Sequence, residues 1–177
     1  MIIRPATIDD CKAIAQIHIA GWQTTYRGLV PDAYLDAMQL DERTERWRKT
    51  MADKSMDITL LETADGTVGF CAHGHARTPI PGHTGRINPF SAEIYAIYFL
   101  PAARGQGYGR ALLLHVAKEL VKKHHSGMAL WVLDKNPNAI AFYEKLGGQL
   151  IANRMIDIGG ANLKERAYGW RNLRSLT

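Results

Sequence analysis

The sequence contains little cysteine and has no long apolar run. Its two cysteines, Cys11 and Cys71, lie far apart without CxxC spacing, which argues against a disulfide framework and against a zinc site. Such usage fits a reducing compartment, so we expect a cytoplasmic protein. The first residues, Met-Ile-Ile-Arg-Pro, do not resemble the apolar core of a signal peptide, and no stretch approaches the roughly 18 apolar residues of a membrane span. These absences exclude disulfide scaffolds and integral membrane proteins, and we expect neither a membrane partner nor a bound metal.

The remaining composition is ordinary for a globular protein. A chain of 177 residues with 46% hydrophobic and 22% charged residues predicts one domain, residues 1–177, with a sizeable core. The formal net charge of +5 could attract nucleic acid or an anionic cofactor. The Lys and Arg residues are scattered, however, and the densest run, residues 43–49, is typical of a solvated helix face. We therefore expect no nucleic-acid partner.

The segment 93–121 organises the chain. Residues 93–100 are largely aromatic and β-branched, which predicts a strand that ends at Pro101, because proline cannot donate to a sheet ladder. Residues 104–109 form a glycine-rich loop, and apolar side chains then recur at helical spacing up to Val121. A strand that enters a helix through glycines presents bare backbone N–H groups at a positive helix end. This arrangement predicts an anion site.

The flanking segments predict an α/β fold with a mixed sheet. Thr7, Pro31 and Asp41 are residue types that begin helices. The Asp-Gly pair at 65–66 predicts a hairpin turn, and segment 78–91, rich in Pro and Gly, is expected to be a long loop of the kind that is often functional. The expected helices cover about 7–24 and 136–146, and two further helices begin at 31 and at 41. The further expected strands cover 2–4, 58–63, 68–77, 128–133, 149–158 and 163–170.

Three kinds of anion site share this strand, loop and helix. A P-loop requires Gly-Lys followed by Ser or Thr, but Gly109 is followed by Arg110 and Ala111. A dinucleotide-binding fold requires G-x-G-x-x-G, and here the third glycine stands one residue early, at Gly109. The pattern that fits is R-x-x-G-x-G, formed by Arg104, Gly107 and Gly109.

This pattern closely resembles motif A of the GCN5-related N-acetyltransferase (GNAT) family. The strand before it ends, as in the family, with an I-Y-x-x-P pattern at 97–101. One strand later, residues 136–147 reproduce the N-x-x-A-x-x-F-Y-x-x-x-G pattern of motif B. Two motifs in the correct order and spacing are far more specific than the glycine loop alone. The resemblance covers roughly residues 2–171, and the stretch 22–31 resembles a subgroup of uncharacterised bacterial acetyltransferases.

The resemblance implies the GNAT fold, a mixed, mostly antiparallel sheet of about seven strands that splays between two parallel strands, with helices on both faces. It implies acetyl-CoA as co-substrate, with the pantetheine arm pairing with the strand backbone and the pyrophosphate held by the glycine loop. A Cβ at Gly107 or Gly109 would push the phosphate away, and Arg104 either adds a cation near it or is a solvated surface arginine. The cofactor-binding residues that the resemblance implies are Ile97, Phe99, Arg104, Gly105, Gln106, Gly107, Tyr108, Gly109, Arg110, Asn136, Ala139 and Phe142.

The resemblance also implies two catalytic side chains for acyl transfer from a thioester to an amine. The amine arrives protonated at pH 7 and must lose a proton, and the leaving thiolate is better expelled with a proton supplied. Glu93 is the candidate base and Tyr143 the candidate acid, while the backbone N–H of Phe99 is the candidate donor to the oxyanion. From the residues alone, Tyr143 could equally belong to the core and Glu93 could be an exposed strand-end glutamate. A covalent route through Cys71 is disfavoured because it lies in an apolar strand.

The acceptor amine is only weakly indicated. In the family it lies against the first two helices, the loop at 78–91 and the last hairpin, so we expect Trp22, Tyr26, Tyr34 and His73 to bind substrate. A small amine or an amino acid, acetylated by direct attack, is the preferred acceptor. A protein or peptide N-terminus or a lysine is the alternative acceptor, and a non-catalytic acyl-CoA-binding sensor is the alternative class. Homodimers are frequent in the family, so a homodimer is left open.

Overall fold

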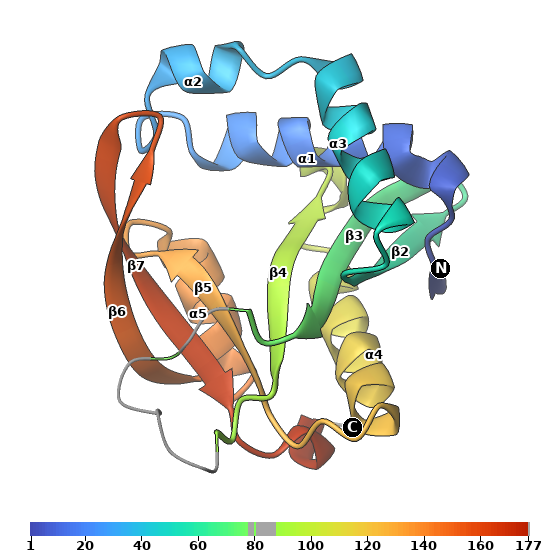
Figure 1. Cartoon of the computed structure of the whole chain (residues 1–177), viewed down its shortest axis with the longest axis vertical. Helices are drawn as coiled ribbons and strands as arrows, with labels where there is room; N and C mark the ends of the chain where they lie inside the picture. Colours follow the sequence, from blue (N-terminus) through green and yellow to red (C-terminus); the bar gives the residue numbers. More distant parts are fainter. Residues whose placement is uncertain (78–79, 81–87, 177) are drawn as a thin grey trace. The chain divides into compact units, whose positions relative to one another are not determined.

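The computed structural model describes residues 1–77, 80 and 88–176, and the chain divides into two compact units (Figure 1). Unit 1 comprises Met1–His73 and Ala96–Leu113, and unit 2 comprises Gly74–Tyr95 and Leu114–Thr177. Three elements, β3 (Gly66–His75), β4 (Ala92–Phe99) and α4 (Tyr108–Lys122), contribute residues to both units.

The strands form a seven-stranded mixed sheet with the order β1-β2-β3-β4-β5-β7-β6. β4 and β5 run parallel, whereas the pairs β1–β2, β2–β3, β5–β7 and β6–β7 are antiparallel. The predicted α/β class and the mostly antiparallel sheet are therefore confirmed. The other strands are β1 (Ile2–Pro5), β2 (Asp57–Thr63), β5 (Met128–Leu133), β6 (Gln149–Ile158) and β7 (Ala161–Trp170).

Unit 1 holds the three N-terminal helices. α1 (Cys11–Thr25) follows a short 3₁₀ turn, and the Thr7 N–H donates to the Asp10 carboxylate over 2.7 Å at its start. One side of α1 is apolar and buried, and Ile14 on that side is fully inaccessible. α3 (Leu40–Ala52) packs against α1, and its Trp47 is buried (Figure 1).

Two helix starts in unit 1 differ slightly from the prediction. α2 (Asp32–Asp36) begins after Pro31, so this proline is the N-cap and not the first helical residue. α3 is preceded by Gln39, so Asp41 lies inside the first turn instead of capping it. There its carboxylate still stabilises the helix, because it lies at the positive end of the helix dipole.

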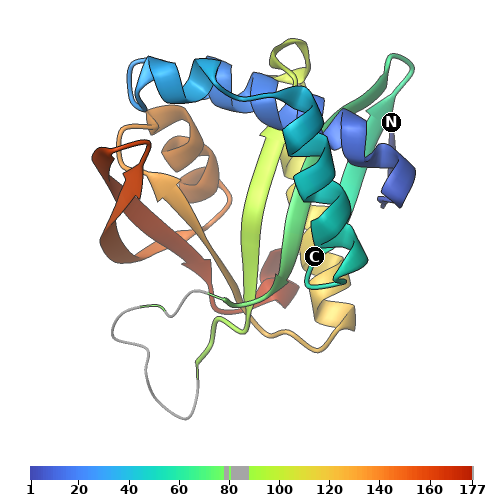
Figure 2. The ribbon, with the colours of Figure 1, turned by 45° about the horizontal axis from the view of Figure 1, so that its top comes forward.

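Unit 2 contains α5 (Pro137–Lys145) and the β6–β7 hairpin, which lie beside each other in Figure 2. The Ala139 N–H donates to the side-chain oxygen of Asn136 over 3.2 Å, so Asn136 caps α5 where the helix was predicted to begin. The indole N–H of Trp170 on β7 donates to the Leu146 carbonyl over 2.8 Å and fixes the end of α5. β7 begins earlier than predicted, because the two glycines at 159–160, with φ of 62° and 84°, complete the turn alone.

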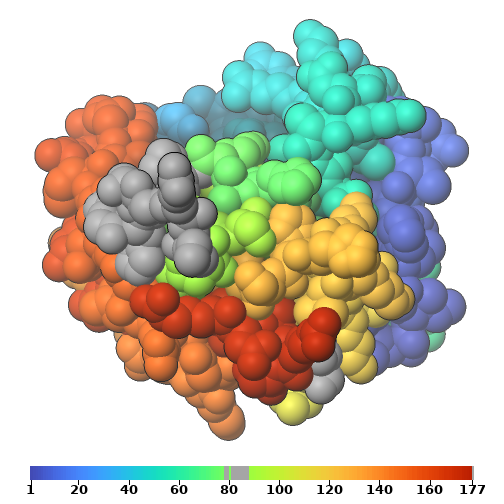
Figure 3. Space-filling view, turned by 60° about the horizontal axis from the view of Figure 1, so that its bottom comes forward, coloured from blue at the N-terminus to red at the C-terminus, as the bar shows by residue number. Residues whose placement is uncertain are grey.

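The C-terminal segment of unit 2 ends in a 3₁₀ turn (Leu173–Leu176) that lies at the surface beside the end of α4 (Figure 3). The Leu173 N–H donates to the Ser126 carbonyl over 2.8 Å, and the Leu173 side chain is fully buried. None of the helices in the described part of the chain is long and apolar enough to cross a membrane.

Candidate active site

The glycine loop of unit 1 leads directly into α4. Gly105 and Gly107 have φ of 77° and 79°, the left-handed region that side-chain-bearing residues rarely adopt. The Ala111 N–H donates to the Gly107 carbonyl over 3.1 Å, which is the first hydrogen bond of the helix. The N–H groups of residues 108–110 therefore have no carbonyl to donate to within the helix. Tyr108 and Gly109, expected to lie in the loop, belong to the first helical turn instead.

The space around this loop is open. A Cβ added at Gly105 or Gly107 would meet no described atom within 4 Å. The requirement for glycine thus comes from the backbone conformation, because no described atom crowds a Cβ at either position. Unused N–H donors at the start of a helix are the groups that an anion site needs.

Arg104 is neither a freely solvated arginine nor buried. Its Nη2 donates to the Thr24 hydroxyl over 2.8 Å and to the Thr25 hydroxyl over 3.2 Å. Both threonines end α1, so this cation stabilises the negative end of that helix dipole. A guanidinium has five N–H groups, so three remain for another ligand next to the loop.

The strand before the loop supplies backbone groups. The register between β4 and β5 covers only Ala92–Ile94 and Met128–Leu130. The resemblance to the GNAT family predicts that the backbone of the later residues of β4 pairs with the pantetheine arm. The Phe99 ring occupies the place that a Cβ of Gly69 would take, at 2.2 Å, so β3 must carry a glycine there.

Glu93 lies near the start of β4, in unit 2, and is buried, with 6% of its surface exposed. Its carboxylate accepts the Arg77 N–H over 2.9 Å. The guanidinium of Arg77 lies 3.4 Å over the Tyr95 ring, and the Tyr95 hydroxyl donates to the His75 carbonyl. The interpretation of Glu93 as an exposed strand-end glutamate is therefore wrong, because the segment after β3 covers it.

Tyr143 is on α5 in unit 2 and is 7% exposed. Its ring meets those of Phe142, Tyr168 and Trp170 at centroid distances of 5.2, 6.4 and 6.2 Å. The Tyr168 hydroxyl donates to Glu144 over 2.7 Å. Tyr143 therefore packs as a core residue does, and this packing holds its ring rigidly. Its catalytic role remains a prediction.

Asn136, at the start of α5, has donors left for a ligand. Its side-chain oxygen is used by the helix cap, whereas its amide N–H groups are not part of the cap.

Three of the expected acceptor-binding residues lie together in unit 1. The Trp22 ring is 5.1 Å from that of Tyr26 and 6.1 Å from that of Tyr34, and the Tyr26 hydroxyl lies 3.2 Å from the Tyr98 hydroxyl. His73 is not part of this group, because it is buried and lies 3.0 Å from the Thr59 hydroxyl. Of the expected loop 78–91, residues 78–79 and 81–87 lie outside the described residues.

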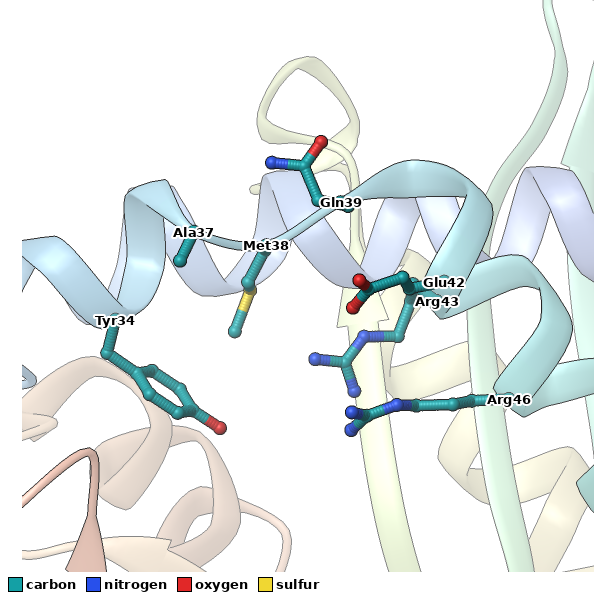
Figure 4. A pocket seen from close by; sticks show the side chains of 7 residues that line it. All are labelled: Tyr34, Ala37, Met38, Gln39, Glu42, Arg43 and Arg46. Carbon is teal, nitrogen blue, oxygen red and sulfur yellow. The ribbon is translucent and has the colours of Figure 1, made fainter.

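A pocket in unit 1 was missed at the level of sequence. It has a volume of about 150 Å³ and is shown in Figure 4. Arg43 and Arg46 line it, although the run 43–49 suggested a solvated helix face. That interpretation is wrong for Arg43, which is half-buried. The i, i+3 spacing of the two arginines, which places them on one side of α3, was the available signal.

Comparison with known proteins shows which family this geometry belongs to. Residues 22–148, which are more than half of the chain, match the model of the acetyltransferase (GNAT) family. The chain belongs to the GNAT family. It is therefore an acyltransferase, and the family and fold predicted from the two motifs are confirmed.

Several relatives cover nearly the whole of this GNAT protein. It is 33% identical to the uncharacterized N-acetyltransferase YuaI of Bacillus subtilis (strain 168), over 98% of this chain and 95% of the relative. It is 24% identical to a spermidine N(1)-acetyltransferase of Thermoplasma acidophilum, over 82% of this chain and 86% of the relative. Among solved structures, yncA of Salmonella typhimurium, a putative acetyltransferase with its cofactor acetyl-CoA, is 20% identical and has a TM-score of 0.69, covering 98% of this chain and 94% of that one.

No covalent intermediate on Cys71 fits this GNAT protein. Cys71 is fully buried, and burial raises the pKa of its thiol, so no thiolate is available to attack a thioester. Cys11, fully buried in α1, has its pKa raised by burial as well. Among the described residues, no group of three or more His, Cys, Asp or Glu side chains is arranged to hold a metal ion.

Proposed function

We propose that this GNAT protein is an acetyl-CoA-dependent N-acetyltransferase that acetylates the primary amine of a small molecule or an amino acid. The observation that carries the proposal is the loop of Gly105 and Gly107, which leads into α4 and leaves the amides of residues 108–110 without a carbonyl partner inside the helix. The pyrophosphate of acetyl-CoA is the anion that this family resemblance implies. The Salmonella relative, which carries acetyl-CoA, supports the choice of coenzyme.

In the proposed reaction, the amine attacks the thioester carbon directly. The Glu93 carboxylate, directly or through water, takes the proton that the amine must lose. The N–H of Phe99 donates to the oxyanion of the tetrahedral intermediate. The carbon–sulfur bond then breaks, and the Tyr143 hydroxyl gives its proton to the departing sulfur. The products are the acetylated amine and CoA with a free thiol.

The proposal is tested by coenzyme binding and by thiol release. Acetyl-CoA at about 100 times its Kd should stabilise the protein by roughly 2.7 kcal/mol, which raises the Tm in a thermal shift assay. A screen of amines should then release the CoA thiol with at least one of them. Stabilisation without thiol release would favour the acyl-CoA sensor, and no stabilisation would refute coenzyme binding.

Replacement of Glu93 tests the proposed base. Glu93→Gln keeps an oxygen that can accept the Arg77 N–H, so we expect the fold to persist. It removes the proton acceptor, so kcat should fall about 100-fold and the acidic limb of the pH–rate profile should disappear. Glu165→Gln is the matched control, because Glu165 is a similarly buried carboxylate of unit 2 that pairs with Arg154 over 2.7 Å. An unaltered profile in Glu93→Gln would count against the base.

A polyamine is a second candidate acceptor. The relative from Thermoplasma acidophilum is named a spermidine N(1)-acetyltransferase and is 24% identical to this chain. Spermidine carries several positive charges at pH 7, because its amines have pKa values near 10. Thiol release with spermidine but not with amino acids would favour this acceptor.

A further inference from the structure

We infer that the pocket of unit 1 between α2 and α3 binds a carboxylate of the acceptor, so that the natural acceptor is an amine that also carries a carboxylate. This inference rests on the proposed acetyl transfer and names its substrate class. Tyr34, one of the residues expected to bind the acceptor, lines the pocket and lies next to Trp22.

The pocket is small and strongly charged. Its volume of about 150 Å³ is several times the roughly 30 Å³ that one water molecule occupies, so it has room for a carboxylate on a short stem. In Figure 4, the guanidinium groups of Arg43 and Arg46 point the same way from α3, toward the hydroxyl of Tyr34, and the Met38 side chain lies between. Its lining residues are Tyr34, Ala37, Met38, Gln39, Glu42, Arg43 and Arg46.

The two arginines have no carboxylate partner in the part of the chain that the structure describes. Nowhere in the described residues 1–77, 80 and 88–176 does a carboxylate form an ion pair with Arg43 or Arg46 within 4.0 Å. Burial, and next the neighbouring Arg46, lower the pKa of Arg43 from its ordinary value. Two adjacent like charges, one of them half-buried, are unfavourable unless an anion joins them. Arg48, by contrast, pairs with Glu45 over 2.9 Å on the outer face of the same helix.

The shape of a guanidinium selects the kind of anion. Its planar donors match the two oxygens of a carboxylate, and such charged hydrogen bonds are stronger than neutral ones. The Tyr34 hydroxyl, which is part of the same lining, can donate a further hydrogen bond. Glu42 also lines the pocket and offsets only one of the two positive charges. The pocket thus has an excess of one positive charge and of N–H donors.

His18 adds no charge to this region. It lies in an aromatic cluster of unit 1, with ring centroids 5.7 Å from Trp22 and 5.4 Å from Tyr98. Neither of its ring nitrogens has a hydrogen-bond partner among the described residues. Burial, and secondly the positive charge of Arg43, lower the pKa of His18 to about 3, so the ring is neutral at pH 7. Arg43 therefore meets no imidazolium charge from His18, and the charge of the pocket is set by its own lining residues.

The same charges disfavour a polyamine. A spermidine chain would bring further positive groups toward Arg43 and Arg46, with Glu42 as the single carboxylate of the pocket. At about 4 Å and an effective dielectric constant near 20, two like charges repel by roughly 4 kcal/mol. An amino acid avoids this repulsion, because the group that it directs toward the arginines is an anion.

The test compares each standard amino acid with its amide, which lacks only the carboxylate charge. The amine of an amide has a pKa near 8 and is less often protonated, so a preference for the acid would not arise from amine basicity. Affinity is measured by calorimetry on enzyme saturated with CoA, and turnover by thiol release with acetyl-CoA. We expect the best acid to bind at least tenfold more tightly than its amide.

Arg43→Gln and Arg46→Gln should each weaken binding of that acid by about 10- to 100-fold. This is the range expected for the loss of a hydrogen bond to a charged group. The affinity for the amide should not change. Arg48→Gln is the matched control on α3 and should bind the acid as the wild type does. Arg43→Lys, which keeps the charge, should recover part of the affinity. An unchanged thermal shift with acetyl-CoA shows that each variant is folded.

The outcomes separate two claims, which are that the pocket binds a carboxylate and that the protein transfers an acetyl group. Equal binding of acid and amide, no binding of either, or unchanged affinity in both variants would overturn the carboxylate pocket. A loss of acetyl-CoA affinity in the variants would overturn it too, because the arginines would then serve the coenzyme. Acid binding that depends on both arginines without any thiol release would support the pocket and refute acetyl transfer. Thiol release that is equal for acids and amides would support the transfer alone.

Discussion

Gly107→Asp is expected to abolish acetyl-CoA binding. Gly107 has a φ of 79°, accepts the first hydrogen bond of α4 and directly precedes the unpaired amides of residues 108–110. A carboxylate at this place would face the pyrophosphate. Like charges about 4 Å apart repel by roughly 4 kcal/mol at an effective dielectric constant of 20, which corresponds to a loss of about 1000-fold in affinity. Calorimetry with acetyl-CoA measures the effect.

Two variants separate charge from backbone strain. Gly107→Asn has nearly the same size and tolerates a left-handed conformation as well as Asp does, so it should bind more weakly than wild type but far better than Gly107→Asp. Gly66→Asp places the same residue at another positive φ, 98°, where an added Cβ also meets no described atom within 4 Å. It lies in the β2–β3 turn and should bind acetyl-CoA normally. Tight binding by Gly107→Asp would refute the assignment of the loop to the pyrophosphate.

Tyr143→Phe is expected to lower kcat by about 100-fold with little change in the affinity for acetyl-CoA. The variant loses only the hydroxyl, so the ring contacts with Phe142, Tyr168 and Trp170 persist. Without a proton donor, the sulfur must leave as a thiolate, and general acid catalysis is worth 10²- to 10⁴-fold. Steady-state kinetics with a saturating amine, together with calorimetry, separate the two effects.

Tyr168→Phe is the matched control for Tyr143→Phe. Tyr168 belongs to the same aromatic cluster, and its hydroxyl donates to Glu144 over 2.7 Å. Removal of that hydroxyl should lower the free energy of unfolding by about 1 kcal/mol and leave kcat unchanged. An unchanged kcat in Tyr143→Phe, or an equal loss in both variants, would remove Tyr143 from the mechanism.

Local patterns in the sequence predicted most of the elements. β5 and β6 have the predicted bounds, because an apolar run and a glycine pair mark their ends. α5 begins after Asn136, where a helix was predicted, since an Asn-Pro start supplies both an acceptor and a preset φ. Errors of one or two residues arose at Pro31, at Asp41, at both ends of β3 and at the start of β7. At these ends several neighbouring residues can begin the element, and the spacing alone does not choose among them.

The charged side chains were harder to place. Glu93 stands at the start of a strand in the sequence, and only the fold shows that it is buried and accepts the Arg77 N–H. Arg43 was assigned to a solvated face, yet it is half-buried and lines a pocket beside Arg46. His73, expected to bind the acceptor, is buried and lies against Thr59 in the β2–β3 pair, and its role stays a prediction. Burial of a polar group depends on residues remote in the chain, which periodicity does not reveal.

The sequence by itself determined the family and predicted which loop binds the coenzyme. Arg104, Gly107, Gly109 and the pattern from Asn136 to Gly147 are local in the chain, and their chemistry follows from backbone conformation and helix ends. Only the tertiary structure decided which charges are desolvated and which remain unpaired. The packing of the N-terminal helices places Arg43 and Arg46 beside a pocket and partly buries Arg43. This matters because the electrostatic energy of a charge depends on its distance from water and from opposite charges.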